Sequence, residues 1–149
     1  MWLTITEDDV KPRLSDVEKN AIERIDKTDA GTPLADIIAT TIAEFRTAIK
    51  TNPANRLDAD ETTLPRSVFN LAIARIVWIF VSRAAGTARV TAEDPRRLLF
   101  DKSEQLLADI RSRKAPVEDP DGVVETGTAS ATVVISTPTR FERSKFNTL

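Results

Sequence analysis

The chain has 149 residues, a length that suits one domain with a sizeable core. Its 21 Lys and Arg against 23 Asp and Glu give a formal net charge of −2, so no overall charge draws it toward nucleic acid or anionic lipid. Histidine and cysteine are both absent, which removes the commonest general base, the usual zinc ligands and every thiol nucleophile. We therefore expect a protein that is not an enzyme and uses no cofactor.

The N-terminal part of the chain predicts two short helices. Thr6 precedes three acids, which favours a helix start, and Pro12 should stop that helix. Ser15 and Glu18 fit a capping box, so a second helix should run to about residue 26. Its expected apolar stripe consists of Leu14, Val17, Ala21, Ile22 and Ile25.

The next prediction is an amphipathic helix over residues 33–50, with Pro33 at its first position and apolar residues at helical spacing. Residues 51–64 then form a polar loop that is longer than a simple turn between helices. In this loop Asp58, Asp60 and Glu61 have the alternating spacing of a calcium loop, but its glycine and closing glutamate are missing. We therefore interpret these acids as part of a solvated loop or, with Arg56, as a surface for a neighbouring protein.

Residues 65–85 predict a central helix that Gly86 ends, because almost no polar face interrupts its apolar residues. Arg75 lies inside this helix and should have a carboxylate partner, with an intersubunit contact as the alternative. Trp78 and Phe80 are expected in the core. The apolar stretch 68–81 is too short to cross a bilayer, and the N-terminus lacks a secretory signal, so we expect no membrane contact and a cytoplasmic location.

A last helix should begin at a cap near Asp94 and Pro95 and run to about Arg113, with a stripe that starts at Leu98 and Leu99. The basic segments 94–97 and 111–114 could touch phosphate without reading bases, so sequence-independent contact with passing DNA is one hypothesis for them. The other is that they are solvated helix ends. The fold class is thus all-α, a compact bundle of about four helices in a domain of residues 1–115.

Residues 116–149 form a second region, a C-terminal arm rich in Pro, Gly, Ser and Thr. Its segment 132–136 is β-prone yet has no second strand nearby, which favours a strand donated to an adjacent subunit over a frayed end. Aromatic and basic residues follow it, a composition common in segments that order on binding. The expected interaction residues of the arm are Val133, Val134, Ile135, Arg140, Phe141, Arg143 and Phe146.

The order of elements from Leu3 to Leu14 onward resembles the Mu-like prophage head-tail connector family, whose members are also called head completion proteins. The resemblance covers about residues 3–115 and includes the 33–50 helix, Leu64-Pro65 before an apolar helix with Ala74-Arg75, and a closing helix ending near Ile110-Arg111. The chain departs from the family where Asn55-Arg56-Leu57 stands in place of Gly-Arg-Tyr, in the longer acidic loop, and in the arm.

The resemblance implies a small structural adaptor that forms a ring at the portal vertex and carries no catalytic residue. Its partners would be copies of itself, the portal and the tail-side neck proteins, and its place the bacterial cytoplasm or the virion of an active prophage. A ring needs a heterologous interface, which the acidic loop and the basic arm could supply. The alternative hypothesis is a nucleic-acid-associated regulator that contacts phosphate through basic helix ends.

Overall fold

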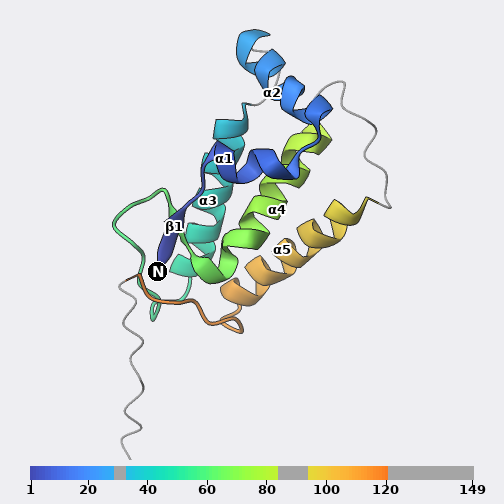
Figure 1. The fold of residues 1–149 in the computed structure, drawn as a ribbon. Coiled ribbons are helices and arrows are strands. Elements are labelled where there is room, and N and C mark those ends of the chain that lie inside the picture. The colour runs from blue at the N-terminus through green and yellow to red at the C-terminus, as the bar shows by residue number, and fades with distance from the viewer. Residues whose placement is uncertain (29–32, 84–93, 121–149) are drawn as a thin grey trace, which may run out of the picture.

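A computed structural model describes residues 1–28, 33–83 and 94–120, and these form a mostly helical fold (Figure 1). The all-α class predicted from the sequence is confirmed at this level. In chain order the elements are β1 (Trp2–Thr4), α1 (Glu7–Val10), a 3-10 turn η1 (Lys11–Arg13), α2 (Asp16–Thr28), α3 (Leu34–Lys50), β2 (Thr63–Pro65), α4 (Arg66–Arg83) and α5 (Pro95–Arg111).

The N-terminal caps lie where the sequence predicts them. The carboxylate of Asp9 accepts hydrogen bonds from the backbone N–H and hydroxyl of Thr6, which fixes the start of α1. The 3-10 turn that contains Pro12 ends this helix, since proline cannot continue the backbone ladder. At α2 the Ser15 N–H donates to Glu18 Oε2 at 2.8 Å, and the Glu18 N–H donates back to Ser15 Oγ.

Helices α3 and α4 form the centre of the fold, and their predicted extents are close to those observed. Figure 1 shows α3, α4 and α5 side by side, and α4 also contacts β1 and α1. Consequently α4 has buried residues on successive turns all round its surface, as its sequence predicts. The predicted end of this helix at Gly86 lies outside the described residues.

A two-stranded antiparallel sheet was missed by sequence reasoning. Strand β1 pairs with β2, and the register places Trp2 opposite Pro65 and Thr4 opposite Thr63. Each strand has only three residues and the partners are far apart in the chain, so no local alternation reveals them. The pairing ties the N-terminus to the start of α4.

The core joins side chains from the sheet and from every α-helix. Phe80 is buried as expected, whereas Trp78 is half-buried and packs against Phe100 with ring centroids 6.0 Å apart. Three positions correct the predicted apolar stripes, because their side chains are exposed: Val17 at 62%, Leu98 at 60% and Leu99 at 41%. Helical spacing placed them inward, but no element covers them fully.

The segment after α5 returns to the start of the chain. A turn with Arg113 in the left-handed region ends the helix two residues before the predicted end. The chain then passes the N-terminus, where the indole N–H of Trp2 donates to the Glu118 carbonyl oxygen at 3.0 Å. The Glu118 carboxylate accepts from the Ser67 N–H in the first turn of α4. Residues 116–120 of the predicted arm therefore lie against the helical domain.

None of the helices in the described ranges combines the length and apolar character needed to cross a bilayer.

Candidate functional site

The polar loop predicted between the helices is held in shape by Arg46 of α3. Its guanidinium donates to the backbone carbonyls of Asp58 at 2.6 Å, Asp60 at 2.8 Å and Thr63 at 3.0 Å. Because a planar guanidinium has five donors in fixed directions, one side chain can fix three points of the loop. The sequence offers no local signal for this role, since the carbonyls that Arg46 binds are 12 to 17 residues away.

Two of the predicted acids also stabilise the loop. Asp58 Oδ1 accepts from the Asp60 N–H, and Asp60 Oδ1 accepts from the N–H and hydroxyl of Thr62. The Thr62 hydrogen bonds hold the pKa of Asp60 below its usual value. By contrast, Glu61 and Arg56 are exposed and have no hydrogen-bond or ion-pair partner among the described residues. Within those residues no group of three or more acids is arranged to hold a metal ion.

An open groove of about 640 Å³ lies between α3, the end of β1 and this loop. Its floor consists of Ile5, Ile38 and Ile42, whose side chains are largely buried. One wall follows exposed small residues at every fourth position of α3, namely Ala35, Ala39, Ala43 and Thr47. Such spacing places them on one helix face. The groove is therefore mainly apolar and follows α3 from Ala35 to Thr47.

Three charged side chains are among the residues that line the groove. Glu7 and the loop residue Glu61 line it, and so does Arg46. The Arg46 guanidinium is already committed, because it bonds the loop carbonyls and stacks 5.5 Å from the centroid of the Trp2 ring. Glu7 forms an exposed ion pair with Lys11 at 2.9 Å. Glu61 is thus the unpaired charge at this surface among the described residues.

Arg75 has the carboxylate partners that the sequence predicts. Its side chain is 9% exposed and donates to both oxygens of Glu44 on α3 and to Glu104 on α5. It also lies 5.0 Å from the centroid of the Phe100 ring. Three helices therefore meet at one buried guanidinium. This supports a structural role for Arg75.

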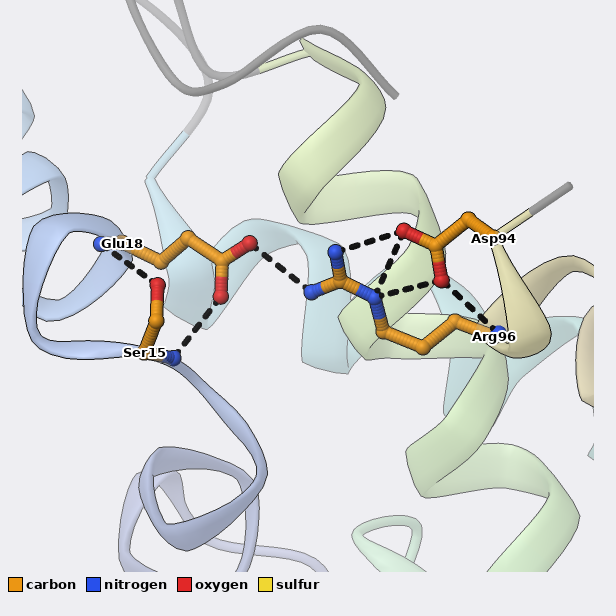
Figure 2. Close-up of polar contacts among 4 residues, drawn as sticks. All are labelled: Ser15, Glu18, Asp94 and Arg96. Carbon is orange, nitrogen blue, oxygen red and sulfur yellow. Dashed lines mark hydrogen bonds and ion pairs between the residues drawn. The ribbon is translucent and has the colours of Figure 1, made fainter. Parts of the chain in front are cut away.

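A second ion cluster connects α2 with α5 and was not predicted (Figure 2). Arg96 donates to Glu18 Oε1 at 2.8 Å and to both carboxylate oxygens of Asp94, the N-cap of α5. Burial raises the pKa of Glu18, but hydrogen bonds from Arg96 and Ser15 outweigh it and leave this pKa below its usual value. Hydrogen bonds from Arg96 likewise lower the pKa of Asp94. All these groups are satisfied by one another, so the cluster fixes the two helix starts together.

The structure thus brings together only part of the predicted interaction residues. Arg56, Asp58, Asp60 and Glu61 share one loop, and Glu61 alone among them lines the groove. The remaining predicted residues lie outside the described residues: Val133, Val134, Ile135, Arg140, Phe141, Arg143 and Phe146. The groove itself was missed, because the alanines of α3 were not distinguished from ordinary small residues on a helix.

Comparison with protein-family models, curated proteins and solved structures found no match to this chain.

Proposed function

We propose that this protein is a structural adaptor of a phage or prophage head-tail junction, which binds other protein subunits and associates with itself in a ring. The proposal rests first on the order of elements in which the chain resembles the Mu-like head-tail connectors. The single observation that carries the binding role is the loop fixed by Arg46, which leaves Arg56 exposed and Glu61 exposed at an open apolar groove.

The architecture proposed with this role is a compact bundle of α2, α3, α4 and α5, with the 51–62 loop and the C-terminal arm as its two contact regions. Arg75 supports a rigid bundle, because its buried guanidinium pairs with carboxylates from two other helices. A rigid bundle suits an adaptor, since it keeps contact surfaces at fixed positions relative to one another. The portal and tail-side neck proteins would be its other partners.

A preorganised loop favours binding, because less conformational freedom is lost when a partner arrives. Three backbone carbonyls of the loop are already bonded to Arg46, and Asp58 and Asp60 are bonded within the loop. Glu61 is therefore the best residue for testing the loop as a contact surface. Substitution of Glu61 removes an exposed charge and leaves these internal hydrogen bonds intact.

The alternative hypothesis, a nucleic-acid-associated regulator, is weakened by the ion cluster in Figure 2. Arg96 belongs to the basic segment 94–97, yet Glu18 and Asp94 hold its guanidinium. Arg111, Arg113 and Lys114 at the end of α5 remain exposed, but so do many surface acids. Contact with passing DNA at this helix end would be weak and independent of sequence.

Two measurements on the full chain test the proposal. Light scattering over a concentration series should show a defined oligomer well above the monomer mass. A gel-shift titration with duplex DNA should show no retardation at physiological salt, because an adaptor without a DNA role lacks a basic surface. A chain that stays monomeric and retards DNA in a salt-sensitive way would contradict the adaptor and support the regulator.

The Glu61→Gln variant sharpens this test, with Glu23→Gln on α2 as the matched control, since Glu23 is exposed and its ion pair with Lys27 lies at the surface. We expect Glu61→Gln to shift association to higher protein concentration and Glu23→Gln to leave it unchanged. Equal association of both variants and the parent chain would exclude the loop from the interface.

A further inference from the structure

The short strand β1 has one open edge. Met1 O accepts from the Arg66 N–H, and the register pairs Leu3 with Leu64, so the backbone groups of Met1 and Leu3 face β2. Backbone groups alternate between the two edges of a strand, and those of Trp2 and Thr4 therefore face away from β2. In the described part of the chain no third strand pairs with them.

Thr4 also lines the apolar groove, so this open edge borders it. An unpaired edge beside an apolar surface is a template for an added strand, because the edge supplies hydrogen bonds and the groove takes alternate side chains. The opposite wall is formed by the alanine face of α3, whose small side chains allow a strand to approach closely. The groove and the edge together define the kind of ligand: an extended, β-branched segment.

We infer that residues 132–136 of the C-terminal arm of a second copy occupy this groove, pairing with the open edge of β1. The inference rests on the proposed self-association and names the surface that performs it. The segment contains Val133, Val134 and Ile135, which are both apolar and β-prone, between Thr132 and Ser136. Their side chains match a floor made of three isoleucines.

Charge fixes the direction of the added strand. The first turn of α1 follows β1 and holds Glu7, Asp8 and Asp9, and Lys11, which pairs with Glu7 and Asp8, offsets only one of these three charges. Glu61 lines the groove from the loop. Basic residues follow the 132–136 segment, namely Arg140, Arg143 and Lys145. A strand parallel to β1 brings the basic residues to the acidic end, whereas an antiparallel strand takes them away from it.

We assign the arm to a second copy because the proposed self-association needs a contact between two different patches, and the arm and the groove supply such a pair. A contact between two different patches is heterologous, so it continues from copy to copy and closes into a ring when the rotation between copies allows it. The last described residues of the arm are anchored at Trp2 and Ser67, and residues 121–131 connect them to the segment. This connection spans at most about 36 Å when extended, which is enough to reach an adjacent copy.

Disulfide trapping tests this inference cleanly, because the natural chain has no cysteine. Two full-length variants of different mass, Ala39→Cys in the groove and Val134→Cys in the arm, are mixed and oxidised. The matched control pairs Val134→Cys with Ala108→Cys, an exposed alanine of α5 that does not line the groove. A docked pair should form the mixed disulfide roughly a hundredfold faster than the control pair at micromolar concentration.

A double variant carrying both Ala39→Cys and Val134→Cys decides between the two sources of the arm. Disulfide-linked dimers and higher ladders on a non-reducing gel are the expected result. A disulfide formed only within one chain would show that the groove holds its own arm and would overturn the inference. Oligomers of normal mass with no preference for the groove pair would also overturn it, while leaving the proposed self-association intact.

Discussion

The two faces of α3 contain the same kind of residue in opposite surroundings. Ala48 on one face is fully buried against the core, with 0% exposure, whereas Ala39 on the other face lines the open groove. The inner face is covered by the core, and the outer face exposes an apolar surface that the described residues leave open. Alanine therefore fills space in the core at one position and borders open space at the other.

The packing of the inner face of α3 against the other helices depends most strongly on Arg75 of α4, whose guanidinium pairs with Glu44 and Glu104. In the double variant Glu44→Ala, Glu104→Ala this buried guanidinium has no carboxylate, and we expect a loss of about 3–5 kcal/mol in the free energy of unfolding. Arg75→Met is the matched control. It should be close to neutral, because Glu44 and Glu104 are partly exposed and can be solvated. Urea unfolding followed by circular dichroism measures the free energy of unfolding of both variants. Equal losses would show that the Arg75 charge does not need its two carboxylate partners.

The difference between the two faces of α3 is tested most directly by replacing one alanine on each face with a larger residue. Ala48→Leu adds volume to a filled core, so it should destabilise the fold by about 1–3 kcal/mol. Ala39→Leu points into open space and should change stability by less than about 0.5 kcal/mol. The same Ala39→Leu variant should lose self-association. If it associates normally, the groove is not the contact surface.

The groove on the outer face of α3 also depends on the loop of residues 51–62 that borders it. Arg46→Ala removes three hydrogen bonds to loop carbonyls, and we expect a loss of about 1–2 kcal/mol together with faster proteolysis within residues 51–62. Arg46→Lys should restore only part of the protection, because an ammonium group lacks the planar fork. Unchanged proteolysis in Arg46→Ala would show that the loop is held by its own side chains.

The smallest effect is expected at the cluster of Figure 2. The pKa values of Glu18 and Asp94 are lowered in the fold, so the cluster contributes stability above the unfolded values near 4 and loses it as pH falls through the folded values. Glu18→Gln should cost about 1 kcal/mol at pH 7 and flatten the decline in stability below about pH 4. A decline identical to that of the parent chain would exclude Glu18 from acid unfolding.

Local patterns predicted the helices well, since caps and apolar spacing act within a few residues. Ser15 with Glu18 marks a helix start that the structure confirms. Pro33, predicted as the first residue of its helix, is the N-cap one position before α3. The sequence also predicted that Arg75 needs a carboxylate. Which carboxylates it binds could not be predicted, because Glu44 and Glu104 lie about 30 residues away on either side.

Most of the candidate site could not be predicted, because it depends on contacts between distant segments. The groove exists only where β1, α3 and the loop meet, and its wall of alanines has no distinctive pattern by itself. The strand β1 is too short to alternate visibly, and Val17 and Leu98 follow helical spacing without a surface to cover them. Burial at these positions is decided by which elements pack together, and spacing along one helix does not contain that information.

Native mass spectrometry of the full chain over a concentration series tests the central claim of head-to-tail association most directly. We expect one dominant closed oligomer in the parent chain and monomer in the Ala39→Leu variant at the same concentration. Monomer in the parent chain throughout the series, or the same oligomer in both chains, would contradict the account.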